Sequence, residues 1–230
     1  MLKLVVLSGA GVSAESGIPT FRDAGGLWEG HDVMEVASPQ GWQKNPELVL
    51  DFYNKRRAAA AAAKPNEGHL ALASLEEDFD VTVITQNIDN LHEQAGSSNV
   101  IHLHGLLSQA RSSIDENMIY DIGTKDINLG DLCKKGSQLR PNIVWFGEMV
   151  PMIEKAAKIS EQADIFIVVG TSLAVYPAAS LIDYVPYTSK IYVVDPNMPY
   201  IKDKHNIKLV NAKATTGLKE IAVELKANYH

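Results

Sequence analysis

A series of short, continuous apolar runs, rich in valine and isoleucine, constrains the fold of this chain most strongly. The runs show little of the alternation expected of a half-exposed strand, so they predict strands that are buried on both faces. Segments with helical patterns separate them, and this alternation indicates an α/β fold with a doubly wound parallel sheet. The runs are residues 4–7, 81–85, 143–146, 165–169 and 191–194, and the helical patterns are residues 46–63, 67–77, 87–94, 152–162 and 215–227.

Two segments stand apart from this alternation. One is a helical insertion at about residues 31–66, and the other, at about residues 106–140, is polar and rich in turn residues. We expect residues 106–140 to form a small inserted module, with a mobile surface loop as the alternative. Residues 1–230 then form a single domain.

The composition argues against several classes of protein. A formal net charge of -7 does not suit a general nucleic-acid binder, which needs a basic surface. No apolar run approaches the roughly 18 residues of a membrane span, and the first residues lack the basic segment and cleavage site of a signal peptide. The single cysteine, Cys133, cannot form an intramolecular disulfide and fits a reducing compartment. We therefore expect a cytoplasmic protein that binds neither nucleic acid nor membranes.

A pair of glycines follows the first predicted strand, in the stretch SGAGVSAESGIPTFRDAGGLW. Gly9 and Gly11 allow a tight turn and the close approach of a pyrophosphate, to which a helix start offers free N–H groups. The strict G-x-G-x-x-G pattern is absent, so an ordinary strand-to-helix turn stays an alternative. Further along this loop, Phe21, Arg22 and Asp23 either pack and form a salt bridge or cover a bound cofactor.

Polar or small residues follow three of the predicted strands. Helix capping explains one of those that follow the second strand, but not all of them. Because the carboxyl ends of parallel strands meet at one edge of a sheet, where open α/β sheets bind ligands, these residues predict a shared cleft. They are Gln86, Asn87 and Asp89 after residues 81–85, Gly170, Thr171 and Ser172 after residues 165–169, and Asn197 after residues 191–194.

Residues 102–105 read HLHG, with two histidines two positions apart after a short apolar start. His102 and His104 can bind a metal, act as a base, or extend from a strand as two solvated imidazoles. The tetrapeptide alone does not distinguish these readings, and the rest of the chain must decide between them.

Taken in order, the segments GAGVSAESGIPTFR, TQNID, HLHG, WFGEMVP, GTSLAVYPAA and VDPN resemble the motifs of sirtuins, the NAD-dependent protein-lysine deacylases. The resemblance extends over nearly the full length of the chain, and the set of motifs is far more specific than any one of them. It implies one catalytic domain, with a Rossmann-like, doubly wound parallel sheet and a small inserted module.

The resemblance also implies roles for individual residues. His104 matches the catalytic histidine, whereas His102 matches no catalytic position. The segments GEMVP and SLAVYP, the second of which contains Val175, would flank an acyl-lysine peptide that binds as an added strand. The residues implied to bind NAD are Gly9, Ala10, Gly11, Phe21, Arg22, Asp23, Trp28, Gln86, Asn87, Ile88, Asp89, Gly170, Thr171, Ser172, Asn197 and, near the adenine, Lys213.

The resemblance to sirtuins also implies a reaction in which these residues take part. The resemblance implies that the acyl-lysine amide oxygen attacks C1′ of the ribose as nicotinamide leaves, and that a base then activates a ribose hydroxyl. A histidine that titrates near neutral pH suits this role. The implied products are free lysine, nicotinamide and O-acyl-ADP-ribose, so NAD is a consumed co-substrate.

The stretch LDFYNKRRAA bears on the identity of the acyl group. Tyr53 and Arg56 are three positions apart and share a helix face, where a guanidinium and a phenol hydroxyl suit a carboxylate. In sirtuins that remove succinyl, malonyl and glutaryl groups, a Tyr-x-x-Arg pair at this place binds the distal carboxylate. The alternative is a surface arginine and a half-buried tyrosine on an alanine-rich helix.

The chain departs from the family at the zinc module. Most sirtuins carry two Cys-x-x-Cys pairs there, but the first region here reads ARSSIDENM, and Gly136 stands where the partner of Cys133 would be. A zinc site needs about four ligands, and the nearby carboxylates alone suit harder metals. We expect no structural zinc, and a module that is held by packing or is partly mobile.

Two other functions on the same scaffold stay open. A protein ADP-ribosyltransferase would modify a side chain, and Tyr53 and Arg56 count against it. A non-catalytic NAD sensor would account for the missing cysteines, and His104 and Asn87 count against it. The expected partners of a deacylase are acylated-lysine proteins or peptides.

Overall fold

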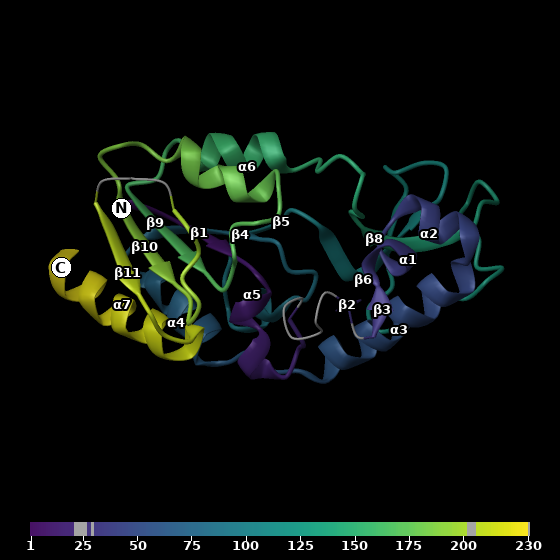
Figure 1. Ribbon diagram of the computed structural model, residues 1–230, viewed down its shortest axis with the longest axis horizontal. Helices are drawn as coiled ribbons and strands as arrows, with labels where there is room; N and C mark the ends of the chain where they lie inside the picture. The colour runs from purple at the N-terminus through teal and green to yellow at the C-terminus, as the bar shows by residue number, and fades with distance from the viewer. Residues whose placement is uncertain (21–26, 29, 202–205, 230) are drawn as a thin grey trace.

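The computed structural model has a large α/β part and a smaller part, which lie end to end along the longest axis of the molecule (Figure 1). Three residues assigned above to the cofactor loop, Phe21, Arg22 and Asp23, lie outside the described residues. No helix in the described ranges is both long and apolar enough to cross a membrane. The structure describes residues 1–20, 27–28, 30–201 and 206–229.

One parallel sheet forms the centre of the large part. Within the described residues its six strands have the order β11-β10-β9-β1-β4-β5, and all neighbouring pairs are parallel. The central strand β1 therefore ends beside β4 on one side and β9 on the other, with Ser8 opposite Thr85 and Val169. The strands are β1 (Lys3–Ser8), β4 (Asp80–Thr85), β5 (Val100–His102), β9 (Ile165–Val169), β10 (Lys190–Val194) and β11 (Ile207–Val210).

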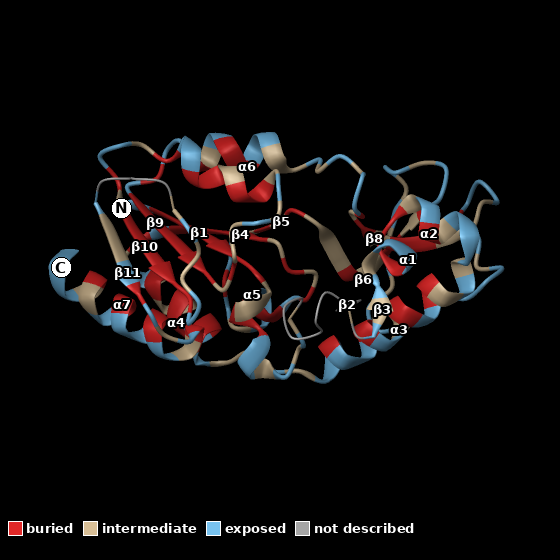
Figure 2. Cartoon of the chain, in the orientation of Figure 1, coloured by how far each residue is buried: buried red, intermediate tan, exposed pale blue. Residues whose placement is uncertain are grey.

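Helices cover both faces of this sheet, and the buried residues concentrate between them (Figure 2). Leu4 and Val6 of β1 pack in a cluster with α4 and α7, whereas Val5 and Leu7 pack in a second cluster with α6 and η4. Successive strand residues point to opposite faces, so a strand covered on both sides needs a continuous apolar run. The predicted doubly wound parallel α/β sheet is confirmed. The covering helices are α4 (Glu67–Ser74), α6 (Ile153–Ser160), α7 (Ala214–Tyr229) and the 3-10 helices η3 (Leu75–Glu77) and η4 (Ala178–Tyr184).

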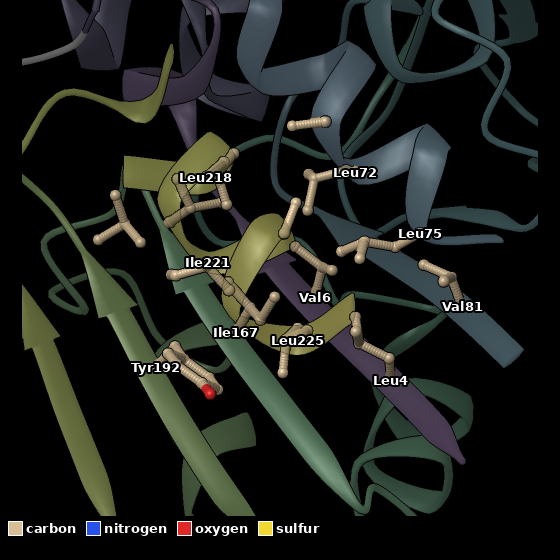
Figure 3. Close-up of a cluster of buried hydrophobic side chains, with 14 of the residues drawn as sticks. Leu4, Val6, Leu72, Leu75, Val81, Ile167, Tyr192, Leu218, Ile221 and Leu225 are labelled. Carbon is tan, nitrogen blue, oxygen red and sulfur yellow. The ribbon is translucent and has the colours of Figure 1, made fainter. Parts of the chain in front are cut away.

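The first of these clusters joins α7 to the sheet (Figure 3). Leu218, Ile221 and Leu225 repeat at the three- and four-residue spacing that places side chains on one helix face, and each is at most 1% exposed. Burying a side chain of this size contributes about 1.5–3 kcal/mol. The cluster fixes the positions of the strand ends that carry the candidate site.

The smaller part consists of an antiparallel sheet in the order β7-β6-β8, with helices packed beside it. This sheet occupies the segment that we expected to be an inserted module. The helices α1 to α3 occupy the expected helical insertion. The elements are β6 (Gly105–Ser112), β7 (Ile119–Asp121), β8 (Leu139–Ile143), β2 (Leu27–Trp28), β3 (His31–Asp32), α1 (Val33–Val36), α2 (Pro39–Lys44) and α3 (Pro46–Ala62).

Some boundaries differ from the sequence-based expectation. The run at residues 143–146 was expected in the parallel sheet, and this was wrong: β8 ends at Ile143 and pairs antiparallel with β6. A short apolar run predicts a strand but does not identify its sheet. The helix expected at residues 87–94 is only α5 (Leu91–Gln94), because residues 87–90 are a loop. The strands β5 and β11 were missed, since each is a short strand at an edge of the sheet.

Candidate functional site

The glycine loop packs directly against the end of β9. The Gly9 N–H donates to the Val169 carbonyl at 3.0 Å, and the Gly11 N–H donates to the Gly170 carbonyl at 2.9 Å. A Cβ atom on Gly11 would lie 2.7 Å from the Cα atom of Gly170, which itself has a φ of 62°. Only residues without side chains allow this approach of two backbones. The loop continues as two single-turn 3-10 helices, η1 (Ala10–Val12) and η2 (Ala14–Ser16).

A buried polar network joins this loop to the end of β4. The Asn87 amide donates to Ser13 Oγ at 3.1 Å, and Ser13 donates to Asp89 Oδ2 at 3.1 Å. Asp89 also accepts the Leu91 N–H at 3.1 Å, a local turn just before α5, whose cap position is Asn90. Burial raises the pKa of the Asp89 carboxyl, and the bonds from Leu91 and Ser13 oppose this. Ser13 was not among the residues predicted from sequence, although a small polar residue two positions after a glycine pair is a usable signal.

A second set of polar groups lies behind this network. Ser8 donates to Thr85 Oγ1 at 2.9 Å, and the Nε2 atom of His92 lies 2.9 Å from Ser8 Oγ. The ring of His69 lies 4.9 Å from that of His92, between centroids. Burial lowers the pKa of His69 to about 4 and that of His92 to about 3, so both rings are neutral at neutral pH. Both histidines were missed, because a histidine within a helical pattern carries no signal of this role.

The strand-end residues on β4 and β9 also meet directly. The Gln86 amide donates to Thr171 Oγ1 at 3.1 Å, which bridges the ends of the two strands. Ser172 follows Thr171 and is half-buried. The structure thus brings together the residues that follow two of the three strands, as expected of a shared cleft.

Two of the residues expected on the adenosine side are more exposed. Asn197 lies at the surface after β10, and its N–H donates to Asp195 Oδ1 at 2.8 Å. The Lys213 side chain is 70% exposed and its ammonium lies 3.7 Å from Glu15. Glu15 belongs to η2, so this ion pair links the start of α7 to the glycine loop.

The two histidines of HLHG hold successive carbonyl groups of the β4 end. The chain bends at residues 103–104 after β5, and Leu103 between the two histidines is buried. His102 Nδ1 lies 3.1 Å from the Asn87 carbonyl oxygen, and His104 Nδ1 lies 3.0 Å from the Gln86 carbonyl oxygen. His102 Nε2 also faces Glu93, at 2.7 Å. For His104 Nε2, the described residues provide no hydrogen-bond partner, so this atom remains available to a ligand.

Tyr53 and Arg56 lie side by side on α3, which begins at an Asn45 cap whose Oδ1 accepts the Leu48 N–H. Tyr53 is fully buried and Arg56 is 7% exposed, so the alternative of a surface arginine and a half-buried tyrosine is wrong. The Arg56 guanidinium lies 4.4 Å from the ring centre of Trp28. The structure therefore places Trp28, which the resemblance assigned to the cofactor, beside the two candidate acyl-binding residues.

This aromatic cluster continues to the segment between β5 and β6 that carries His104. Tyr53 accepts a hydrogen bond from the indole of Trp145 at 3.1 Å, and the neighbouring Val144 donates its N–H to the His104 carbonyl at 3.0 Å. Ile88 packs partly against the same cluster. The candidate acyl-binding residues and the candidate base thus belong to one connected site.

Comparisons with known proteins agree with this arrangement. The sequence matches the Sir2 family over residues 9–177. The chain belongs to the Sir2 family. It is 53% identical over 225 residues to an NAD-dependent protein deacylase of Helicobacter pylori, covering 98% of each chain. It is 51% identical over 226 residues to one of Bacteroides thetaiotaomicron, covering 96% of this chain and 97% of that protein.

Solved Sir2 structures resemble the whole chain. A Sir2 homologue in complex with NAD has a TM-score of 0.89 and 41% identity, covering 99% of this chain and 91% of the homologue. Sir2 bound to an acetylated peptide has a TM-score of 0.80 and 32% identity, covering 97% of this chain and 93% of the other.

The two segments expected to flank a peptide are partly exposed in the present chain. Val175 is half-buried, while Met149 and Tyr176 are 90% and 73% exposed.

The inserted module of this Sir2 chain contains the single cysteine. Cys133 is 5% exposed, and its sulfur lies 3.1 Å from Ser137 Oγ. Among the described residues, no three or more histidines, cysteines and carboxylates are grouped as a metal site would require. The expectation of no structural zinc stays a prediction.

Proposed function

We propose that this Sir2 protein is an NAD-dependent protein-lysine deacylase that transfers the acyl group to ADP-ribose and releases nicotinamide. The relatives named as NAD-dependent protein deacylases support this proposal, at 53% and 51% identity. The observation that carries it is the orientation of His104, whose Nε2 atom is left available while its Nδ1 atom faces the Gln86 carbonyl at the end of β4.

The residues of the cleft fit NAD. Gly9, Gly11 and Gly170 bring two backbones together without side chains, as a pyrophosphate-binding turn requires. The buried Asn87 and Asp89 supply an amide and a carboxyl group, which suit the polar nicotinamide and ribose. Bound NAD would supply an electrophilic ribose carbon and a ribose hydroxyl.

His104 has the properties of the base. A carbonyl oxygen can only accept, so its bond to Gln86 places the proton of the neutral ring on Nδ1 and leaves the Nε2 lone pair for a proton. Burial lowers the pKa of His104, and the Gln86 bond opposes this, so the ring is neutral at neutral pH. We assign His104 to take the proton of a ribose hydroxyl at Nε2.

We further propose that the enzyme prefers acyl groups with a terminal carboxylate, such as succinyl and malonyl, and that deacetylation is a secondary activity. Tyr53 and Arg56 support this proposal, because a guanidinium and a hydroxyl that are both buried on one face of α3 suit the recognition of a carboxylate. The expected substrates are acylated-lysine proteins or peptides of the cytoplasm.

One experiment tests the activity and the preference together. The protein is incubated with NAD and acetyl-, succinyl- or malonyl-lysine peptides, and mass spectrometry identifies the products. We expect free lysine, nicotinamide and O-acyl-ADP-ribose, formed faster from the acidic peptides. ADP-ribose mass added to a protein would favour the transferase instead, and no nicotinamide release with any peptide would favour the NAD sensor. Equal rates for acetyl and succinyl peptides would refute the proposed preference alone.

A further inference from the structure

The hydrogen bond between Trp145 and Tyr53 fixes the direction in which the tyrosine hydroxyl can donate. The Trp145 indole nitrogen lies 3.1 Å from the Tyr53 oxygen, and the two residues are 2% and 0% exposed. An indole N–H is only a donor, so the tyrosine oxygen must accept this bond. The hydroxyl proton then has to point away from Trp145. In the described part of the chain, this proton has no acceptor.

A buried donor without an acceptor is unfavourable, and it marks a place where a ligand can bind. Burial raises the pKa of Tyr53 far above its ordinary value, while the bond from Trp145 and the nearby charge of Arg56 oppose the rise. The hydroxyl therefore keeps its proton across the physiological range. Beside it, Arg56 offers a second donor of fixed positive charge.

The ring of Trp145 is itself held by charged residues of the small antiparallel sheet and of the turn that follows β8. The Arg140 guanidinium lies 3.3 Å from the ring centre of Trp145. Glu148 accepts two bonds from Arg140, at 2.7 and 3.1 Å, and also accepts the backbone N–H of Trp145 at 2.8 Å. A further bond reaches Glu148 from Arg111 at 3.2 Å. These contacts hold the indole ring in one orientation, and they therefore fix the direction of its N–H bond.

We propose that Trp145 is a specificity-determining positioning residue for acidic acyl groups, because its indole N–H turns the Tyr53 hydroxyl proton toward the acyl carboxylate. One carboxylate oxygen would accept from Tyr53 and the other from Arg56. This inference rests on the proposed acyl preference. The residues that select the acyl group would then include Trp145, in the loop after β8, as well as the Tyr-x-x-Arg pair.

The test compares succinyl-lysine with butyryl-lysine peptides, whose acyl groups have the same number of carbon atoms and differ in the carboxylate. The readout is the ratio of kcat/KM for the two peptides. In Trp145→Phe we expect this ratio to fall about tenfold, mainly through a higher KM for the succinyl peptide, as for a lost hydrogen bond to a charged group. Trp42→Phe is the matched control, since Trp42 lies in the same cluster, 5.8 Å from Trp145 between ring centres. It should leave the ratio unchanged.

A double-mutant cycle with Tyr53→Phe separates positioning from packing. If Trp145 acts through the tyrosine hydroxyl, Trp145→Phe has little further effect on the ratio once Tyr53 is phenylalanine. Independent effects of the two substitutions, or an equal fall in Trp42→Phe, would overturn the inference. Should Trp145→Phe fail to fold, Arg140→Lys keeps the charge beside Glu148 but removes the planar guanidinium stack. We expect the ratio to fall there too, and an unchanged ratio would refute the proposal.

The ratio measured for the wild-type protein distinguishes a failure of the proposed acyl preference from a failure of the role of Trp145. A wild-type ratio near one refutes the proposed acyl preference and this inference with it. A high wild-type ratio that Trp145→Phe retains refutes only the role of Trp145.

Discussion

The Nδ1 atom of His104 lies 3.0 Å from the carbonyl oxygen of Gln86. Gln86 also bridges to Thr171 at the end of β9, so the backbone that orients the imidazole is itself fixed between two strands of the sheet. The orientation of the candidate base is therefore a property of the parallel sheet and not of a surface loop.

Substituting His104 should separate chemistry from cofactor binding. We expect His104→Ala to lower kcat for deacylation by about 10²–10⁴-fold, the usual contribution of a general base, and to leave NAD affinity largely intact. Product formation and calorimetric NAD titration measure the two effects. In the wild type, activity should fall as the pH drops through the lowered pKa of His104, because the neutral ring is the active form. Full activity in His104→Ala would disprove the assignment.

His102 should affect the cofactor without being the base. Its ring spans the Asn87 carbonyl and the Glu93 carboxylate, and both are acceptors, so both ring nitrogens must donate for the two bonds to form together. We expect His102→Ala to release the Asn87 backbone and raise KM for NAD about five- to tenfold, the effect of one lost hydrogen bond. The KM for the acyl peptide should stay near the wild-type value. Glu93→Gln keeps an acceptor oxygen and should raise KM for NAD less than His102→Ala does. An equal rise in the KM values for NAD and for the acyl peptide in His102→Ala would count against this role of His102.

The parallel sheet could be predicted from sequence because buried strands such as β9 are continuous apolar runs. The run at residues 143–146 was wrongly predicted to join the parallel sheet. Its composition indicates a strand, but the sheet to which a strand belongs depends on its partner strand, which here is β6. Motif residues such as Asn87 and Asp89 were found because they follow a strand directly. Ser13, His69 and Trp145 were not, since their roles arise from hydrogen bonds to residues distant in the sequence.

The buried pair of His69 and His92 should make the protein less stable in mild acid. Their pKa values, about 4 and about 3, lie below the ordinary 6.5, so the unfolded chain binds more protons as the pH falls from 6.5. Stability is then fully present above pH 6.5 and is lost toward pH 4. At pH 5 each imidazole lowers the free energy of unfolding by roughly 2 kcal/mol. Urea unfolding at pH 7 and pH 5 measures the loss. His92→Gln should reduce it by about half; the same loss in that variant would exclude this origin.

The purified protein should contain no stoichiometric zinc. The resemblance to sirtuins aligns Gly136 with a zinc ligand, and the described residues offer Cys133 no partners for a four-ligand site. Plasma emission spectrometry measures the metal content, and thermal unfolding with and without a chelator measures its effect. We expect zinc far below one atom per chain and the same Tm in both conditions. One zinc per chain, or a Tm lowered by the chelator, would contradict the prediction.

Contacts to α3 should hold the inserted module in place of a metal. The Asn54 side chain accepts the Ile127 N–H and donates to the Ile127 carbonyl, both at 3.0 Å, and Arg57 donates to the Leu107 carbonyl. Asn54→Ala leaves the backbone N–H and carbonyl of the buried Ile127 without these partners. We therefore expect the free energy of unfolding to fall by about 1–3 kcal/mol and the Ile127 amide to exchange its hydrogen faster. Lys55→Ala is the control, because its side chain is 74% exposed and its ion pair with Asp51 lies on the surface. It should change stability by less than about 0.5 kcal/mol. An equal loss in both variants would show that the module does not depend on this contact.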